Sequence, residues 1–353
     1  MARCFLFKPD GIGDFFLASG VVRLMAREFG EENLIIAVLP IMESVVKGQF
    51  PRSKVVSLPI RKKRVILNVF AANLLRCFFS WLSLLGKRVD VSISLRHMRD
   101  YLQSFLFCTV RSPRRILASN LLLGNGRPVR RWTESALERL FSLEITRYPK
   151  GSDGVPSELE ANRLLASVAL RRDVNLLEIW PELKPVGGPP IEGSYSVCAP
   201  FSSDVWKNFP EQRWCELFHE LKRRGQLVHL VLTGSSDQLP RLSDFSRLLR
   251  ESSGEPLSTS IEIASDLQGF IDLLAGANVV FTVDTAAAHA ATALDCRTLV
   301  LFSGLHQGMF GPWNSSPRQQ WVLPEELKKG GAWHEAHSTG KILSIVDKIQ
   351  SAP

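Results

Sequence analysis

Three short stretches of the sequence combine residue types that suit the binding or reaction of a phosphorylated ligand. The first runs from Lys8 to Asp14, reads Lys-Pro-Asp-Gly-Ile-Gly-Asp and follows an apolar run. Its glycines permit a tight turn, and the helix expected next begins with N–H groups and a positive dipole end that attract anions. Asp14 is either a cap of the first helical turn or a general base that takes a proton from a hydroxyl. Asp10 shares this loop, so we do not interpret the two carboxylates as a glycosidase pair.

The second stretch, from Ala199 to Pro210, combines small hydroxyl side chains with one cation. Ser202 and Ser203 come first, Lys207 follows, and a helical pattern begins after the proline. Lys207 would supply a point charge to a diphosphate, and the alternative is an ordinary solvated loop lysine. The pattern therefore predicts a phosphate-binding loop.

The third stretch, from Thr282 to Ala291, places polar residues at the start of an alanine-rich helix. Asp284 and Thr285 fall at the expected helix N-terminus, which is again a natural site for an anion. His289 follows about one turn later, and the alternative to a binding role is a hydrogen-bonded core histidine. The small alanine side chains would let a ligand or another backbone approach this helix closely.

The elements that position these stretches alternate between short apolar strands and helices, which is typical of a parallel sheet covered on both faces. Strands are expected at residues 3–7, 34–39, 54–58, 89–95, 195–199, 227–233, 279–283 and 298–302. Helices are expected at residues 15–29, 65–85, 157–170, 211–224, 239–251, 267–275, 286–294 and 341–349. The fold class is therefore α/β.

A stretch rich in Pro and Gly divides this pattern in two. We expect an N-terminal domain at residues 1–180, a linker at 181–193 and a C-terminal domain at 194–338. A last amphipathic helix within 339–353 could pack back on the first domain. Two such domains would place a ligand cleft between them, at the carboxyl ends of the strands.

The net charge of +8 is concentrated in the N-terminal part of the chain. Residues 1–150 hold 25 Lys and Arg against 11 Asp and Glu, a balance of +14, whereas residues 151–353 hold 18 against 24, a balance of −6. This asymmetry indicates an anionic partner, such as nucleic acid, an acidic membrane surface or a phosphorylated glycan. Because the sequence shows no recognised nucleic-acid-binding motif, we expect no nucleic acid.

The cysteines and the N-terminus bear on the compartment. Six scattered cysteines without a CxxC pair argue against a zinc ribbon and against a disulfide scaffold. The first residues read as a strand rather than as a signal peptide. We therefore expect a cytoplasmic location.

Residues 61–64 are four consecutive basic residues, and they precede the apolar helix expected at 65–85. Arg76 lies within this helix, which argues against a membrane span. Five apolar residues form a stripe along it: Phe70, Leu74, Phe78, Trp81 and Leu85. The stripe either covers the sheet or lies at the inner face of the cytoplasmic membrane, and both can hold on different sides of the helix. Peripheral membrane contact is therefore an open alternative.

The order and spacing of the three stretches resemble glycosyltransferase family 9, the ADP-heptose:lipopolysaccharide heptosyltransferases. Residues 8–14 match the family's R-x-D-x-[IL]-G-D-like loop, with Lys where Arg is common. Residues 207–210 match K-x-W/F-P, residues 234–237 match a G-x-x-E/D step, and residues 284–289 match D-T-G-x-x-H. The resemblance extends from the first strand to about Trp313.

The resemblance implies the GT-B fold, with two Rossmann-like domains whose parallel sheets face a central cleft. The first domain would then be the acceptor side, and the second would bind the nucleotide sugar. The implied reaction is an inverting, metal-independent sugar transfer from a nucleoside diphosphate sugar to a glycan or lipopolysaccharide-type acceptor, anionic or lipid-linked. Heptose is one candidate sugar and ADP-heptose one candidate donor; no cofactor is implied.

The resemblance also implies a role for each matching residue. Asp14 would be the base that takes the proton of the acceptor hydroxyl. The other implied site residues would hold the donor: Gly13 beside the sugar and diphosphate, Ser202, Ser203 and Lys207 at phosphate, Asp237 at the ribose, and Asp284, Thr285 and His289 at the diphosphate and sugar.

Two further residues depart from the family pattern. Ala286 stands where the signature has Gly, so a ligand cannot approach that backbone as closely. Gly20 stands where Pro is common. Two alternatives stay open: a non-catalytic homologue that binds a sugar nucleotide or glycan, and another GT-B sugar-nucleotide enzyme such as an epimerase.

Overall fold

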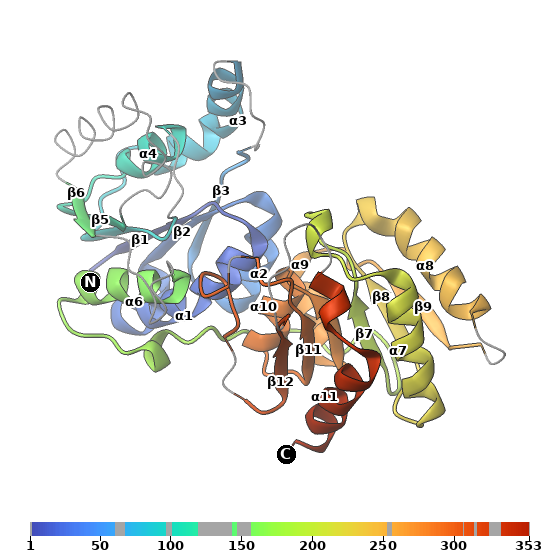
Figure 1. Ribbon diagram of the computed structural model, residues 1–353. Helices are drawn as coiled ribbons and strands as arrows, with labels where there is room; N and C mark the ends of the chain where they lie inside the picture. Colours follow the sequence, from blue (N-terminus) through green and yellow to red (C-terminus); the bar gives the residue numbers. More distant parts are fainter. Residues whose placement is uncertain are drawn as a thin grey trace. The chain divides into compact units, whose positions relative to one another are not determined.

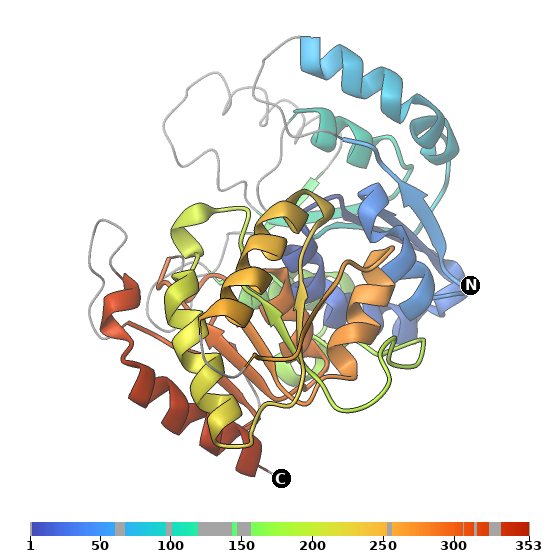
Figure 2. The same ribbon diagram turned by 90° about the vertical axis from the view of Figure 1, so that its right-hand side faces the viewer.

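A computed structural model describes residues 2–60, 68–96, 101–118, 143–146, 157–252, 256–305, 307–313, 316–324 and 333–352. The chain divides into two compact units, Met1–Pro181 and Glu182–Pro353. Each unit contains a six-stranded sheet covered by helices (Figures 1 and 2). The predicted α/β class is confirmed.

The sheet of the first unit is parallel throughout, in the order β3-β2-β1-β4-β5-β6. Its strands are β1 (Cys4–Lys8), β2 (Leu34–Val38), β3 (Lys54–Ser57), β4 (Val91–Ser94), β5 (Arg114–Ala118) and β6 (Leu143–Thr146). The order reverses between β1 and β4, so the loops after these two central strands separate at the carboxyl edge. Such a reversal is where open parallel sheets bind ligands.

Helices cover both faces of this sheet (Figure 1). They are α1 (Ile12–Phe29), α2 (Glu43–Gln49), α3 (Asn68–Leu84), α4 (Tyr101–Cys108) and α6 (Glu158–Leu170), with a 3₁₀ turn η4 (Leu176–Ile179). Aromatic residues of β1 and α4 form the core under α3 and α4, where Phe5 stacks on Phe107. On the other side α1 approaches η4 so closely that a Cβ on Gly20 would lie 1.9 Å from the Ile179 carbonyl oxygen. This contact explains the glycine.

The sheet of the second unit is also parallel, in the order β12-β11-β10-β7-β8-β9. Its strands are β7 (Ser196–Ala199), β8 (Leu230–Thr233), β9 (Thr259–Glu262), β10 (Val280–Val283), β11 (Thr298–Leu301) and β12 (Gln319–Val322). Counted from its own first strand, this order repeats that of the first unit. The reversal lies between β7 and β10.

The second unit carries helices α7 (Glu211–Arg223), α8 (Leu239–Glu251), α9 (Leu267–Ala275), α10 (Ala286–Ala293) and α11 (Thr339–Ser351), and 3₁₀ turns η5 (Val205–Lys207), η6 (Ser236–Gln238) and η7 (Trp333–Ala336). Helix α11, the predicted last helix, packs on elements of the second unit. Its apolar stripe, Ile342, Leu343, Val346 and Ile349, lies in the core of the second unit against α7, β11 and β12. These residues are buried there, which uses the one apolar face of α11.

Two differences from the predicted elements have physical reasons. Helix α1 begins at Ile12 rather than residue 15, so Asp14 lies inside its first turn. The pattern missed the strands β5, β6, β9 and β12 and the helices α2 and α4. Strand β9 is only half-buried, β12 begins with two glutamines and β5 begins with two arginines, so none of these three reads as an apolar run. No helix in the described ranges has the length and hydropathy to cross a bilayer.

Candidate functional site

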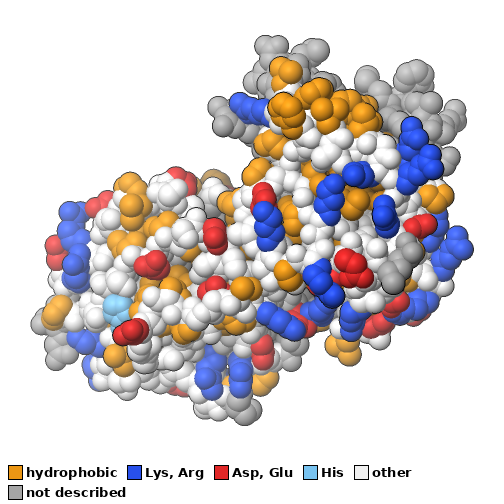
Figure 3. Space-filling model, turned by 180° about the vertical axis from the view of Figure 1, so that it is seen from behind, with side chains coloured by type: hydrophobic (Ala, Val, Ile, Leu, Met, Phe, Trp, Pro, Cys, Tyr) orange, Lys and Arg blue, Asp and Glu red, His pale blue; other side chains and the backbone are white. Residues whose placement is uncertain are grey.

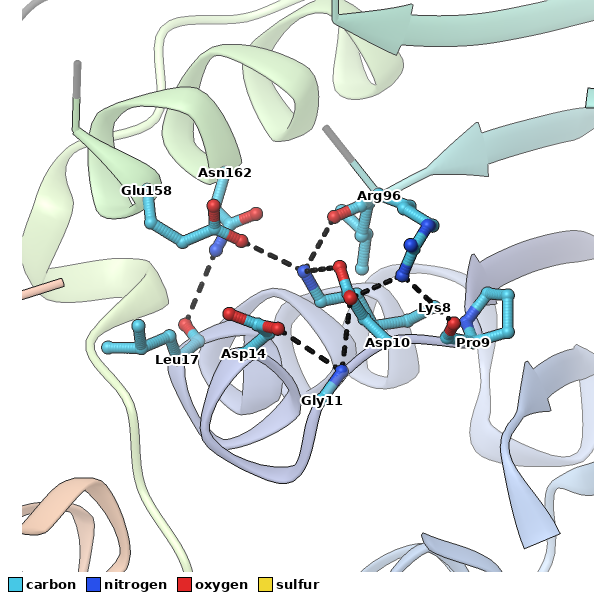
Figure 4. A network of polar contacts seen from close by, with 10 residues as sticks. Lys8, Pro9, Asp10, Gly11, Asp14, Leu17, Arg96, Glu158 and Asn162 are labelled. Carbon is cyan, nitrogen blue, oxygen red and sulfur yellow. Dashed lines mark hydrogen bonds and ion pairs between the residues drawn. The ribbon is translucent and has the colours of Figure 1, made fainter. Parts of the chain in front are cut away.

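Asp14 lies at the carboxyl end of β1, in the first turn of α1. Its Oδ2 accepts the backbone N–H of Gly11 at 3.1 Å, and Oδ1 of Asp10 accepts the same N–H at 3.0 Å (Figure 4). Asp14 thus makes a capping contact in the first turn of α1, as one of its two interpretations predicted. The side chain of Asp14 also interacts with that of Asp10, and Asp14 is partly exposed.

Lys8, the last residue of β1, is buried beside this turn. Its Nζ donates to the carbonyl of Leu95 at 2.7 Å and to Oε1 of Glu158 at 2.8 Å, and lies 3.7 Å from Oδ2 of Asp10. Burial lowers the pKa of Lys8, but Glu158 and then Asp10 and Asp14 outweigh it, so the net pKa is raised. Lys8 therefore stays a cation.

Arg96 joins the same group of charges from the loop after β4. It forms an ion pair with Asp10 and donates to the carbonyl of Pro9 at 3.1 Å, and both Arg96 and Asp10 are buried. Charges from both central strands therefore meet at the reversal of strand order (Figure 4). We call Lys8, Asp10, Asp14, Arg96 and Glu158 the charge cluster.

The charge cluster changes the acidity of Asp14. Burial raises the pKa of Asp14 to about 7, the charges of Asp10 and Glu158 raise it too, and Lys8 opposes the rise. A carboxylate with a pKa near neutrality is a stronger base than an ordinary one and is still ionised in half of the molecules at that pH. Near neutral pH the carboxyl of Asp14 can therefore exchange a proton.

At the corresponding place of the second unit, the loops after β7 and β10 are joined by one ion pair. Nζ of Lys207 lies 2.7 Å from Oδ2 of Asp284, whose side chain is 3% exposed while that of Lys207 is 17% exposed. The alternative of a solvated loop lysine is therefore wrong. A buried carboxylate holds the ammonium at the carboxyl edge of the sheet, with part of its surface accessible.

Thr285 caps α10, as its position predicted. Its Oγ1 accepts the N–H of Ala287 at 3.2 Å and lies 3.2 Å from Oγ1 of Thr282. Ala286 follows, partly exposed, at the first position of the helix. The positive end of α10 thus lies directly after Asp284 in the chain.

His289 is held by aromatic neighbours in the core. Its Nδ1 accepts the indole N–H of Trp313 at 2.9 Å, and the two rings stack with centroids 6.0 Å apart. An indole N–H only donates, so Nδ1 carries no proton and the neutral ring has its proton on Nε2. The core interpretation of His289 is supported, and the sequence pattern did not link it to Trp313.

The remaining predicted residues form fewer contacts. The N–H of Ser202 donates to Oδ1 of Asn208 at 2.7 Å, which folds the loop after β7 back on itself. Ser203 and Asp237 are exposed, and Gly13 is partly exposed in the first turn of α1. All of them follow β1, β7 or β8 in the chain, so each lies at the carboxyl edge of its own sheet, as predicted.

Sequence reasoning missed Lys8, Arg96 and Glu158 as members of a site. Lys8 was noted only as a replacement of the usual Arg, and Glu158 only as part of a predicted helix. Ser157 does cap that helix by accepting the N–H of Glu160 at 3.3 Å. A charged residue at the end of an otherwise apolar strand is the signal that could have identified Lys8.

The family model of glycosyltransferase family 9 (heptosyltransferase) matches residues 158–334, half of the chain. This chain belongs to glycosyltransferase family 9. Lipopolysaccharide heptosyltransferase 1 of Pseudomonas aeruginosa is 32% identical over 117 residues, which cover 32% of this chain. The same match covers 29% of that relative, so less than a third of the relative's length is matched by this chain.

Solved structures resemble the family 9 chain over nearly its whole length. E. coli heptosyltransferase WaaC with ADP-2-deoxy-2-fluoro heptose has a TM-score of 0.70 at 14% identity and covers 98% of this chain and 99% of its own. E. coli ADP-heptose lps heptosyltransferase II has a TM-score of 0.67 at 14% identity, with 99% and 98% covered. At such identity the likeness concerns the fold, and the predicted GT-B type, with two Rossmann-like units, is confirmed.

Proposed function

We propose that this family 9 chain is an inverting glycosyltransferase that moves a sugar from a nucleoside diphosphate sugar to an acceptor hydroxyl. The observation that carries the proposal is Asp14, whose pKa is raised to about 7 beside a fixed set of charges. Asp14 takes the proton of the acceptor hydroxyl as its oxygen attacks the anomeric carbon. The bond to the diphosphate breaks on the opposite face, so the anomeric configuration inverts.

Lys207 acts on the leaving diphosphate. Negative charge grows on the phosphate oxygens as the bond breaks, and a cation already fixed in place stabilises it without reorganisation. Asp284 holds the ammonium at 2.7 Å, and the N-terminus of α10 adds a positive dipole end. Asp284 thus serves by orienting Lys207 rather than by meeting phosphate itself.

We propose that the fixed cation of Lys207 takes the place of a metal ion at the leaving diphosphate, in a reaction that requires neither a metal ion nor a cofactor. For the donor we propose ADP-heptose, because the WaaC structure similar to this chain holds an ADP-heptose analogue. The acceptor we propose is an anionic, lipid-linked glycan, since residues 1–150 carry the positive balance.

The proposal is tested by incubating the full chain with ADP-heptose and a lipopolysaccharide-type acceptor in EDTA. We expect release of ADP and a product with inverted anomeric configuration in its NMR spectrum. Tight binding of ADP-heptose in a thermal-shift assay without turnover would instead identify a non-catalytic homologue. A product with retained configuration would contradict the base role of Asp14.

We also propose that the enzyme contacts the anionic inner face of the cytoplasmic membrane. Helix α3 exposes apolar side chains at three- and four-residue steps: Leu75, Phe78, Phe79 and Leu82, followed by Leu85. They gather at the top of the space-filling view (Figure 3). Cys77 and Leu84 fill the core on the other side, so one side of α3 covers the sheet and the opposite side is exposed. Of the predicted stripe, Phe78 and Leu85 are exposed, whereas Trp81 packs against the core.

The charges around these side chains suit an anionic surface. Arg76, Lys87 and Arg88 are exposed beside them, and each basic residue adds about 1 kcal/mol at such a surface. Residues 61–64, and the side chains of Phe70 and Leu74, lie outside the described residues. The surface of α3 alone therefore supports the proposal.

Vesicle flotation tests this contact. The wild-type chain should float with phosphatidylglycerol vesicles at low salt, and neither with phosphatidylcholine vesicles nor at high salt. Leu75→Ser with Phe79→Ser should abolish flotation, whereas Leu177→Ser, at a side chain equally exposed in the same unit, should not. If the double variant instead changes the oligomeric state, the surface binds a second copy of the chain.

A further inference from the structure

A hollow of about 340 Å³ opens beside the loop after β7, within the second unit. The side chains that line it include Trp206, Asn208, Phe209 and Pro210 from η5 and the residues leading into α7, Arg241 from α8 and His334 from η7. Small-molecule sites in proteins have volumes from about 300 Å³ upward. None of these residues belongs to the base or the donor residues of the proposed function, so the hollow is a separate feature of this unit.

Buried aromatic rings hold the wall of the hollow in shape. Phe209, which lines it, is 1% exposed, and its ring centroid lies 6.0 Å from that of the buried Trp333. The indole N–H of Trp333 donates to the carbonyl of Trp206 at 2.9 Å. This hydrogen bond fixes the backbone of η5, from which the Trp206 side chain projects. A ligand would therefore meet a wall that is already in place, which lowers the entropy lost on binding.

Trp206 adds an exposed aromatic surface to this wall. It is 67% exposed, although a tryptophan side chain gains free energy when it is covered. An exposed apolar side chain that lines a hollow indicates a binding site. An indole combines a flat apolar face with an N–H donor, and a sugar ring likewise combines an apolar face of C–H groups with hydroxyls. A sugar ring lying flat on the indole would therefore cover this surface.

Arg241 supplies positive charge at the same hollow. Its Nε donates to Oε1 of Glu211 at 2.9 Å, and its guanidinium lies 3.9 Å from the centroid of the Phe201 ring. Within the described part of the chain, Nη1 and Nη2 of Arg241 form no hydrogen bond, so these two nitrogens can donate to a phosphate or a carboxylate. The residues that line the hollow include no acidic side chain, which disfavours a cationic ligand.

We propose that this hollow binds one sugar ring of an anionic glycan, stacked on the indole of Trp206, with the phosphate or carboxylate of the glycan at the guanidinium of Arg241. A small inorganic anion would leave the indole uncovered, and an uncharged aromatic ligand would leave the guanidinium without a partner. The sugar held here is one that does not itself react. That the glycan is an acceptor rests on the proposed function, whereas the binding site itself does not.

The test titrates the full chain with the phosphorylated core oligosaccharide released from a lipopolysaccharide, by calorimetry and by NMR of the indole N–H groups. The signal of Trp206, identified by its loss in Trp206→Phe, should shift on binding. Trp206→Ala should weaken binding by roughly ten-fold, because the stacking surface is lost. The control is Val228→Ala, at an equally exposed apolar side chain of the same unit, which should bind like the wild type.

The role of Arg241 is tested with the same oligosaccharide before and after removal of its phosphates. Arg241→Gln should weaken binding of the phosphorylated form by roughly ten-fold and leave binding of the dephosphorylated form unchanged. Arg247→Gln, at an exposed and ion-paired arginine of the same helix, should change neither. An equal loss for both forms would contradict the contact between Arg241 and the anionic group.

Absence of binding by the wild type, or equal binding by folded Trp206→Ala, would overturn the inference. Displacement of the oligosaccharide by ADP would also overturn it, since the hollow would then belong to the donor site. If Trp206→Ala does not fold, the indole shift and Arg241→Gln still decide. In the transfer assay Trp206→Ala should raise KM for the acceptor and leave kcat unchanged. If the wild type binds the oligosaccharide but transfers no sugar, the proposed function fails while the glycan site stands.

Discussion

The two units place different charges at the same position of the same topology. In each, the strand order reverses between two central parallel strands, and an ion pair joins the loops that follow them. In the first unit the pair is Arg96 with Asp10, and in the second it is Lys207 with Asp284. Topology therefore decides where polar side chains converge, whereas it does not decide what they do.

The number of charges separates the two sites. In the first, the carboxylates Asp10, Asp14 and Glu158 lie with the cations Lys8 and Arg96, and burial together with the charges of Asp10 and Glu158 raises the pKa of Asp14. The second pairs one buried carboxylate with one cation that is partly accessible. Under the proposed function, the raised pKa suits Asp14 to act as a base, and the partly accessible cation suits Lys207 to bind an anion.

The largest effect is expected from Asp14→Asn, which removes the base and keeps the shape. Transfer should fall by roughly 10²–10⁴-fold, while ADP binding by the second unit stays unchanged. Turnover assays and calorimetric titration with ADP check both. The control is Asp173→Asn, at an exposed carboxylate of the same unit. Full turnover in Asp14→Asn would show that the first site does not supply the base.

The pH dependence of the transfer rate and of the stability tests the raised pKa of Asp14, which distinguishes the first site from the second. The base must be ionised, so the transfer rate should rise with pH through about 7. The free energy of unfolding should change in the opposite direction, because the pKa of Asp14 in the folded protein is above its ordinary value of 3.8. The contribution of Asp14 to stability is therefore lost as the pH rises through about 7. Asp14→Asn should remove this loss in urea unfolding at pH 5 and pH 8, and an equal pH dependence in both proteins would contradict the raised pKa.

An intermediate effect is expected from Lys207→Gln. The variant should bind ADP more weakly by about 2 kcal/mol, roughly 30-fold, because a charged hydrogen bond to phosphate is lost, and adenosine binding should not change. Asp284 would be left buried and unpaired, so the double variant Lys207→Gln with Asp284→Asn separates stability from binding. Lys184→Gln, an exposed lysine, is the control. Equal losses for ADP and adenosine would place Lys207 away from phosphate.

The smallest effect is expected from Ala286→Gly, which restores the usual residue of the signature. ADP-heptose should bind a few-fold more tightly, since the backbone at the start of α10 becomes approachable, at a cost in stability of up to about 1 kcal/mol. Binding and unfolding are measured on the same sample. Weaker binding would indicate that the methyl group contacts the donor.

Much of this organisation could be predicted from the sequence. The alternation of apolar strands and helices predicted two α/β units, because buried parallel strands leave a continuous apolar signal. The motif residues Asp14, Lys207 and Asp284 all lie in the segments that follow strands β1, β7 and β10, as the sequence predicted. Short polar strands such as β9 and β12 were missed, since their stability comes from neighbouring strands rather than from their own composition.

The sequence by itself determined the strands, the loops after them and the residue types available at each loop. Only the tertiary structure decided which charges face one another. Glu158 meets Lys8 across 150 residues, and Arg96 meets Asp10 across 86. A periodic pattern reports which side of an element is buried, whereas the pKa of Asp14 depends on its burial and on the charges of Asp10, Lys8 and Glu158, which come from β1, the loop after it and α6.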